Sequence, residues 1–366
     1  MVGPVSSPVQ SVPSAAAPAS NRTLRVVAIG GGTGLSTLLR GLKRHVISLS
    51  PVVSPTLLPA PPYISRLTGI VTVTDDGGSS GRLRKELGVP PPGDIRNCMT
   101  ALSDDEELLS QLFRYRFSGG GLDGHSFGNL FLSALADVCG DFSLAVKLSS
   151  AILKTRGEIY PSSANSNLQL DALMHNGKRV RGETRITASR SGIARLRLIP
   201  ANAHPLPQAL EAILDADIVS LGPGSLFTSV IPNLLVHGVP QAIADSKGVR
   251  VYICNLMTQP NESTGLSASQ HIEAIFNHAK CKVFDYAMLN YAPVPSELRA
   301  RYADDNSEPL YNDLDAIRNL GVTPILGDYL DATQFARHAA DRITVDLLNL
   351  PAQLRGQERR SSAPSL

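Results

Sequence analysis

The chain has 366 residues, long enough to bury a large hydrophobic core without disulfides or structural metals. Its apolar fraction of 43% is ordinary for a globular protein, and its net charge of +2 gives no argument for nucleic acid or an anionic membrane as a partner. No apolar run reaches the ~18 residues of a transmembrane helix, and the four cysteines form no Cys-x-x-Cys pair. We therefore expect a cytoplasmic protein with reduced thiols and without membrane insertion.

Both ends of the chain have the composition of disordered segments. Residues 1–23 are rich in Pro, Ser, Ala and Val, and residues 355–366 (RGQERRSSAPSL) are polar. The first twenty residues contain no Lys or Arg and no continuous apolar block, so they do not resemble a signal peptide. We expect one folded domain over 24–345.

The folded part begins with a strand, a glycine turn and a helix. Residues 24–29 (LRVVAI) predict a strand, and four leucines on one face predict a helix over 35–44. Between them lie Gly30, Gly31, Gly32, Thr33 and Gly34. Glycine lets a backbone approach a ligand closely, and a helix start attracts phosphate. The spacing is neither Gly-x-Gly-x-x-Gly nor a Walker A loop, so a turn that serves only packing is the alternative.

A second strand is expected over 68–74, after a proline-rich loop at 50–62 that is long for a βαβ connection. It runs into Asp75 and Asp76, at the strand end that faces the ligand crevice in open α/β sheets. Two carboxylates there could hold a divalent cation such as Mg²⁺, or one could accept a hydrogen bond from a ribose. A solvated Asp-Gly turn is the alternative.

Three further polar segments could contribute to a ligand site. Residues 77–81 predict a flexible loop with Ser79 and Ser80, and residues 90–97 predict a rigid proline turn. That turn carries Asp94, Arg96 and Asn97, which could bind phosphate, base or sugar, or could form an ordinary surface turn. Residues 124–129 hold His125 and Asn129. His125 could act as an acid or base or donate a hydrogen bond, whereas capping of the next helix is the alternative.

The middle of the chain predicts a β-rich excursion, at about 158–200. Asn176-Gly177 is a strong hairpin turn, with expected arms at 168–173 and 178–186. Helices are expected over 104–116, 129–138 and 206–214. Strands are expected over 217–221, 249–253, 283–289 and 323–326.

The strand ends in the second half of the chain are also polar. Gly222, Gly224 and Ser225 form a second glycine turn, which could bind an anion for the same reason as the first. Asn255, Thr258 and Gln259 follow the strand at 249–253 and could add polar contacts. Arg337 lies in a C-terminal stretch that predicts an amphipathic helix with a solvated face.

These motifs, in this order, resemble the YvcK branch of the CofD-like superfamily, the gluconeogenesis factors. The resemblance runs from Arg25 to Arg342 and rests on GGGTGLSTLLRGLK, TVTDDGGSSGRLR, PPGDIRNCMTAL, GHSFGNL, ADIVSLGPGSLFTSVIPNLLV and CNLMTQPNESTG. It implies a Rossmann-like three-layer α/β/α fold with a mostly parallel sheet. It also implies a cytoplasmic protein that binds a nucleotide sugar such as UDP-N-acetylglucosamine.

The resemblance further implies a regulatory protein needed for cell shape and wall synthesis on gluconeogenic carbon sources. Its partner would be a protein of wall-precursor synthesis. Assembly into a homo-oligomer is a further possibility. The alternative is a Mg²⁺-dependent transferase acting on a nucleoside-diphosphate-linked donor, as in the 2-phospho-L-lactate transferase of the same superfamily, with Asp75 and Asp76 as metal ligands.

The resemblance also maps the family's ligand site onto this chain. Arg337 matches an arginine associated with nucleotide-sugar binding, although its surroundings differ from the family pattern. At 260–263 the family's usual Pro-Gly-Glu-Thr is Pro-Asn-Glu-Ser. The expected site comprises Gly30, Gly31, Gly32, Thr33, Gly34, Asp75, Asp76, Ser79, Ser80, Asp94, Arg96, Asn97, His125, Asn129, Gly222, Gly224, Ser225, Asn255, Thr258 and Arg337.

Overall fold

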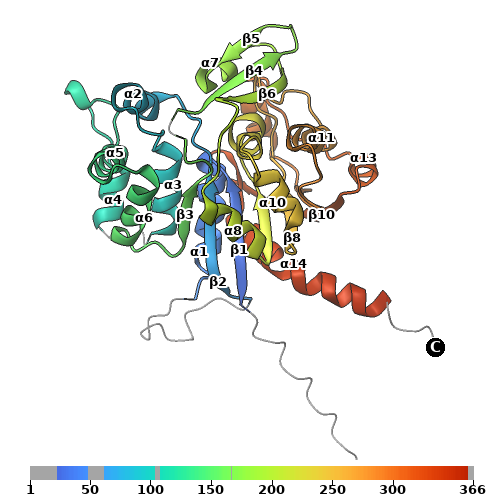
Figure 1. Cartoon of the computed structure of the whole chain (residues 1–366). Coiled ribbons are helices and arrows are strands. Elements are labelled where there is room, and N and C mark those ends of the chain that lie inside the picture. The colour runs from blue at the N-terminus through green and yellow to red at the C-terminus, as the bar shows by residue number, and fades with distance from the viewer. Residues whose placement is uncertain (1–22, 48–61, 104–107, 166, 362–366) are drawn as a thin grey trace, which may run out of the picture.

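The protein is described by a computed structural model, which covers residues 23–47, 62–103, 108–165 and 167–361 (Figure 1). Nearly all of the expected N-terminal extension, and the proline-rich loop up to residue 61, lie outside these ranges.

The centre of the molecule is a seven-stranded sheet in the order β10-β9-β8-β7-β1-β2-β3. Every pairing in this sheet is parallel, so it is parallel throughout. β1 and β2 are apolar and largely buried along their length, as expected of strands covered on both faces. The strands are β1 (Leu24–Gly30), β2 (Ile64–Val71), β3 (Glu158–Pro161), β7 (Ile218–Leu221), β8 (Val249–Ile253), β9 (Tyr286–Asn290) and β10 (Thr323–Gly327).

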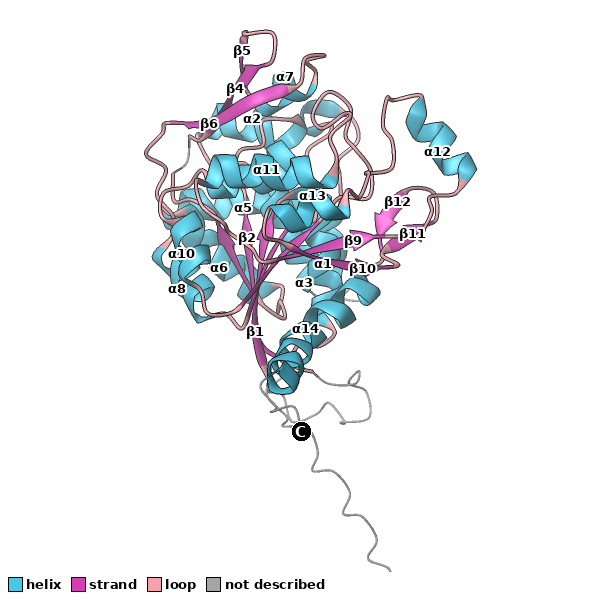
Figure 2. Cartoon of the chain, turned by 90° about the vertical axis from the view of Figure 1, so that its right-hand side faces the viewer, coloured by secondary structure: helices cyan, strands magenta, loops and turns pink. Residues whose placement is uncertain are grey.

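Helices cover both faces of this sheet, which gives the expected three-layer α/β/α fold (Figure 2). Helices α1, α3 and α14 lie on one side and α8 and α10 on the other. The α-helices outside the β-rich excursion are α1 (Gly32–Lys43), α2 (Gly78–Leu87), α3 (Gly93–Leu102), α4 (Leu108–Arg114), α5 (Phe127–Cys139), α6 (Phe142–Ile152), α8 (Pro207–Asp215), α9 (Ile231–Leu234), α10 (Val239–Asp245), α11 (Ala268–Ala279), α12 (Ser296–Ala303), α13 (Leu314–Asn319) and α14 (Ala340–Ser361).

The strand order indicates where a ligand crevice lies in this sheet. From β1 the chain adds β2 and β3 on one side, then returns to β7 beside β1 and adds β8, β9 and β10 on the other. The direction of winding therefore reverses between β1 and β7. In open parallel sheets, ligands bind at the carboxyl ends of the strands next to such a reversal. The two glycine turns follow β1 and β7, so they border this crevice.

The β-rich excursion is a separate antiparallel sheet in the order β5-β4-β6. Its strands are β4 (Gln169–Met174), β5 (Arg179–Arg181) and β6 (Ile193–Ile199). Helix α7 (Glu183–Thr187) lies between β5 and β6 in the chain. Two expectations were wrong in detail. Residues 158–161 belong to the main sheet as β3, and the expected arm at 178–186 is the short β5 followed by α7, because Gly182 turns the chain with φ +92°.

Two helices stand where a loop and a turn were expected. Residues 78–87 form α2 although they lack an apolar stripe, because Ser79, Ser80 and Gly81 are small enough to be buried against neighbouring elements. Residues 93–102 form α3, whose buried residues include Ile95, Cys98, Met99 and Leu102 at helical spacing. This helical spacing was already visible in the sequence, directly after the prolines of the expected turn.

Several helices and strands begin or end at other residues than expected. β2 ends at Val71 rather than at 74, α4 begins at Leu108, and residues 104–107 lie outside the described ranges. α14 continues to Ser361, so residues 355–361 are helical rather than part of a disordered tail. Arg337 lies in a two-stranded hairpin of β11 (Leu330–Ala332) and β12 (Ala336–His338), not in a helix.

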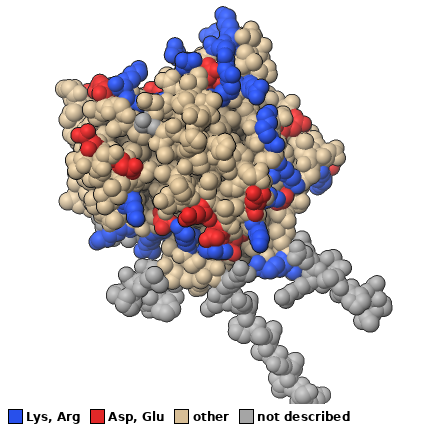
Figure 3. All heavy atoms as spheres, in the orientation of Figure 1, with Lys and Arg blue, Asp and Glu red and all other residues tan. Residues whose placement is uncertain are grey.

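Charges of both signs are mixed over the face seen in Figure 3, apart from a group of basic side chains at the tip of the β-rich excursion. Part of this basic group is paired, because Arg179 and Arg197 both contact the buried carboxylate of Asp171. Within the described residues, no single helix is both long and apolar enough to cross a membrane. One bent pair of helices, Leu226–Leu234 and Val239–Asp245, is long and apolar enough when the two helices are counted together. Its residues are largely buried in the core of the protein.

Candidate functional site

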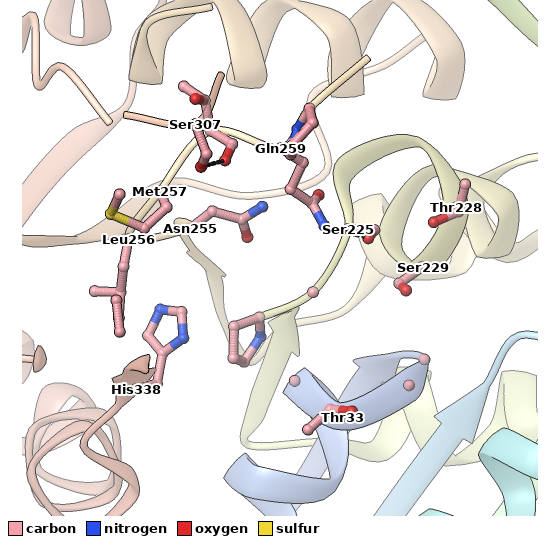
Figure 4. Close-up of a pocket in the computed structure, with 18 of the residues that line it drawn as sticks. Thr33, Ser225, Thr228, Ser229, Asn255, Leu256, Met257, Gln259, Ser307 and His338 are labelled. Carbon is pink, nitrogen blue, oxygen red and sulfur yellow. Dashed lines mark hydrogen bonds between the residues drawn. The ribbon is translucent and has the colours of Figure 1, made fainter. Parts of the chain in front are cut away.

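A cavity of about 600 Å³ opens at the carboxyl ends of β1, β7 and β8 (Figure 4). It lies at the reversal of the sheet, where the strand order places a ligand crevice. Ten of the expected site residues line it: Gly31, Gly32, Thr33, Gly34, Asp75, Asp94, Gly224, Ser225, Asn255 and Thr258.

The two glycine turns touch each other across the cavity floor. Gly32 starts α1 with φ +61°, a conformation that favours glycine. A Cβ on Gly34 would lie 2.2 Å from the carbonyl oxygen of Pro223, so only glycine fits between the turns. The fully buried Asn233 holds them in register, because its Nδ2 donates to the carbonyl oxygens of Gly30 and Ser229.

The second turn leads into a π-helical turn, η3 (Leu226–Val230), whose backbone N–H groups already bind a carboxyl group of the protein. Phe227 N donates to Oε1 of Glu262 at 2.7 Å, and Thr228 N also bonds this carboxylate. Burial raises the pKa of Glu262 to about 7, although the two backbone donors act in the opposite direction. π-helical turns occur frequently at functional sites.

Carboxylates from three separate segments line one side of the cavity: Asp75, Asp94 and Glu183. Burial is the main cause that raises the pKa of Asp94 to about 6, with Asp75 adding to it, whereas the N–H of Gly32 lowers it. Burial, then Asp75 and Asp94, raises the pKa of Glu183 well above its ordinary value. Among the described lining residues there is no Lys or Arg. The lining of the cavity therefore becomes less negative as the pH falls below about 6.

The expected pair of metal ligands does not converge. Asp75 faces the cavity and accepts a hydrogen bond from Gly77 N. Asp76 turns toward α7, where its Oδ1 accepts from the backbone N and Oγ1 of Thr184, at 2.8 and 2.6 Å. The described part of the chain contains no group of three or more His, Cys, Asp or Glu placed to hold a metal ion. The side chains of the two adjacent carboxylates thus contact different neighbours in this structure.

His125 belongs to a buried network beside the cavity. Its Nδ1 lies 3.0 Å from Ser79 Oγ, which also accepts from Nδ2 of Asn129 at 3.1 Å. Ser126 caps α5 by accepting from Asn129 N. Burial is the main cause that lowers the pKa of His125. The network joins the start of α2 to the start of α5, and so it supports the loop after β2.

The remaining expected residues also lie outside the cavity lining. Ser80 Oγ accepts from Gly93 N and so joins α2 to the start of α3, whereas Arg96 donates to Oδ1 of Asn97 at 2.6 Å within α3. The expected residues that do not line the cavity are Gly30, Asp76, Ser79, Ser80, Arg96, Asn97, His125, Asn129, Gly222 and Arg337.

Arg337 lies at the rim. Its neighbours on β12, Ala336 and His338, line the cavity, and side chains alternate along a strand, so Arg337 points the other way. Its guanidinium carbon lies 5.4 Å from the centre of the exposed Phe335 ring.

Several lining residues were absent from the expected site. His338 places Nε2 at 2.9 Å from the carbonyl oxygen of Cys254, and burial lowers the pKa of His338 to about 4, so the ring is neutral and donates to that oxygen. Tyr302 accepts a hydrogen bond from Ala336 N. Others are Glu183, Asp305 and Ser307. Gln259 also lines the cavity, as its position after β8 had suggested, and so does Ser229 after the second glycine turn. The Arg-His pair on β12 was a sequence signal for His338, whereas Glu183 and Tyr302 had no local signal.

Comparison with known proteins gives a consistent relationship over most of the chain. Residues 26–330 match the family model described as 2-phospho-L-lactate transferase CofD. The gluconeogenesis factor of Halalkalibacterium halodurans is 43% identical over 341 residues, which cover 92% of this chain and 98% of that protein. The gluconeogenesis factor of Bacillus subtilis strain 168 is 40% identical over 329 residues, covering 88% and 98%.

A solved structure shares the fold. The crystal structure of a UPF0052-family protein from Bacillus halodurans superposes with a TM-score of 0.81 at 43% identity, over 89% of this chain and 99% of that chain. The motifs, the fold and these relationships agree: the chain belongs to the CofD family, in its gluconeogenesis-factor branch.

Proposed function

We propose that the protein is a cytoplasmic regulatory protein that binds a nucleotide sugar of the UDP-N-acetylglucosamine type. The observation that carries this proposal is the cavity itself, which lies where the sheet reverses and is floored by two glycine turns in contact. The diphosphate would lie along residues 31–34, at the start of α1, where backbone N–H groups and the helix dipole favour negative charge.

Polar and aromatic side chains on the opposite wall suit the nucleoside. Asn255 and Thr258 could bond the hydroxyl and base groups, and the ring of Tyr302 offers a flat surface for a base. Because the described lining has no cationic side chain, the countercharge would come from the rim. Arg337 is the candidate, since it lies between two lining residues and its long side chain can turn.

The chain's relatives are named gluconeogenesis factors, which links the proposed role to gluconeogenic growth. We propose that the bound nucleotide sugar controls a protein partner in wall-precursor synthesis, and through it cell shape on gluconeogenic carbon sources.

The testing experiment is a calorimetric titration with UDP-N-acetylglucosamine, GDP and NAD, with and without Mg²⁺, followed by analysis of the recovered nucleotide. We expect selective binding of the UDP-sugar, which is recovered intact. Arg337→Ala should weaken binding while the fold survives, and Gly32→Val should weaken binding at some cost in stability, because Gly32 has φ +61°. Arg301→Ala is the matched control for Arg337, because its guanidinium lies 5.6 Å from the same Phe335 ring. Unchanged affinity in Arg337→Ala would remove that residue from the site.

A transferase is the second candidate, favoured by the description of the matching family model. A chemically altered nucleotide in the recovered sample would support it. In that case Asp75→Asn should abolish turnover, because Asp75 faces the cavity, whereas Asp76→Asn should act mainly through its contact with Thr184. Full turnover in Asp75→Asn would exclude a role for this carboxylate.

A further inference from the structure

A second hollow, of about 840 Å³, adjoins the cavity. Its walls come from three segments that are distant in sequence, at 190–192, 260–264 and 304–306, and we refer to it as the outer groove. Pro260 and Asp305 line both the cavity and the outer groove, so the two hollows adjoin at these residues. A ligand longer than a nucleoside diphosphate could therefore reach from one into the other.

The outer groove offers polar side chains of both signs. Arg190, Asp304 and Asp305 line it, and within the described ranges none of these three side chains has a hydrogen-bond or ion-pair partner. Carboxylates accept and guanidinium donates, so together they match the paired donors and acceptors of sugar hydroxyls. Two free carboxylates against one guanidinium make the groove unfavourable for an acidic group.

Asn261 fixes the wall of the outer groove. It has φ +62°, a conformation that Asn adopts more readily than most residues. Its amide Nδ2 donates to the carbonyl oxygen of Thr187 at 3.2 Å. This bond ties the 260–264 segment to α7. No described residue donates to its Oδ1, which is therefore free to accept from a ligand.

We propose that the outer groove binds the sugar of the nucleotide sugar whose nucleoside diphosphate occupies the cavity, and that it favours a neutral, hydroxyl-rich sugar over an acidic one. This inference rests on the proposed function, which places the diphosphate at the glycine turns.

The experiment compares UDP, UDP-N-acetylglucosamine and UDP-glucuronate by calorimetry on the full chain. The variants are Asp304→Ala and Asn261→Gly, both outside the cavity lining. Asn261→Gly keeps a residue that tolerates positive φ, so the backbone is preserved. Glu297→Ala, on the same helix as the Asp304 cap but outside both hollows, is the control.

We expect the wild type to bind UDP-N-acetylglucosamine more tightly than either UDP or UDP-glucuronate. Each variant should lose about fivefold in affinity for UDP-N-acetylglucosamine, the effect of one net hydrogen bond, with the affinity for UDP unchanged. Equal weakening of UDP and UDP-N-acetylglucosamine, or no change in either, would overturn the groove assignment while the proposed function stands. Tighter binding of UDP-glucuronate would overturn the preference for a neutral sugar. A wild type that binds neither UDP nor UDP-N-acetylglucosamine overturns both proposals.

Discussion

Asp94 connects protonation to ligand binding at the scale of a single residue. Its carboxylate lies against the first glycine turn, and burial together with Asp75 raises its pKa to about 6. Above that pH the ionised carboxylate repels an anionic ligand placed at the turn, and below it the neutral acid does not. The nucleotide should therefore bind more tightly at low pH.

The first prediction concerns this pH dependence. Affinity for UDP-N-acetylglucosamine should fall by about tenfold between pH 5 and pH 8, which corresponds to a ligand-induced rise of about one unit in the pKa of Asp94. Asp94→Asn retains an acceptor for Gly32 N and should make the affinity less dependent on pH. Calorimetry at several pH values measures both proteins. A constant wild-type affinity over this range would contradict the prediction.

Glu262 connects protonation to stability instead. It is buried at the start of η3, and its pKa of about 7 in the folded protein exceeds its ordinary value of 4.5. Below pH 4.5 both folded and unfolded chains hold the proton. As the pH rises from 4.5 to 7, only the unfolded chain releases it, so the free energy of unfolding falls over this window.

The second prediction is that Glu262→Gln removes this part of the pH dependence. Gln keeps an oxygen that accepts from Phe227 N, but it carries no charge to bury. At pH 8 the variant should be more stable than the wild type by up to the order of 3 kcal/mol, the free energy of a shift of about 2.5 pKa units. Urea unfolding from pH 4 to 8 measures it. Parallel pH profiles for the two proteins would refute this account of Glu262.

At the scale of elements, the contact between the two glycine turns joins α1 to the turn after β7. Gly34 is the residue through which this contact is made, and the backbone of Pro223 leaves no room for a Cβ. A displaced α1 would also move the N–H groups that we propose bind the diphosphate.

The third prediction follows from this packing. Gly34→Ala should lower the free energy of unfolding by about 1–3 kcal/mol, as overpacking does in well-packed interiors, and should weaken nucleotide binding. Gly121→Ala is the matched control, because a Cβ there meets no atom within 4 Å. Denaturant unfolding and calorimetry on both variants provide the measurements. Equal effects of the two substitutions would show that the tight contact is not what matters.

At the scale of the whole molecule, the cavity draws its walls from the length of the chain. Its lining begins at Gly31 and ends at His338, and it includes Glu183 from the β-rich excursion. A ligand held there contacts both halves of the sheet and α7. It would therefore stabilise the folded chain against global unfolding rather than one local element.

The fourth prediction is that UDP-N-acetylglucosamine raises the Tm in a concentration-dependent way. At a free ligand concentration of 100 times Kd, the added stability should be about 2.7 kcal/mol. Gly32→Val, which blocks the proposed phosphate turn, should show a smaller shift. Thermal unfolding followed by circular dichroism measures it. A Tm that does not change at saturating ligand would contradict binding to the folded state.

Much of the fold and part of the candidate site could be read from local patterns. β1, the first glycine turn and α1 are adjacent in the chain, so their apolar spacing and glycines were enough to predict a strand, a turn and a helix. The turn after β7 follows the same logic. Parallel strands present their carboxyl ends at one edge, which is why residues 31–34 and 224–225 meet in one cavity.

Tertiary structure alone decided which side chains face the ligand. Asp75 and Asp76 are adjacent in the sequence, yet one lines the cavity and the other caps α7, because α7 arrives from the β-rich excursion more than a hundred residues later. The side chains of Arg337 and His338 likewise point in opposite directions, because β12 is a strand and not a helix.

The sequence by itself thus determined the α/β class, the two glycine turns and the family, since these depend on short-range spacing and motif order. Glu183 and Tyr302 enter the cavity only through the packing of distant segments, which no local pattern encodes. The raised pKa values of Asp94 and Glu262 arise from burial, which exists only once the chain has folded.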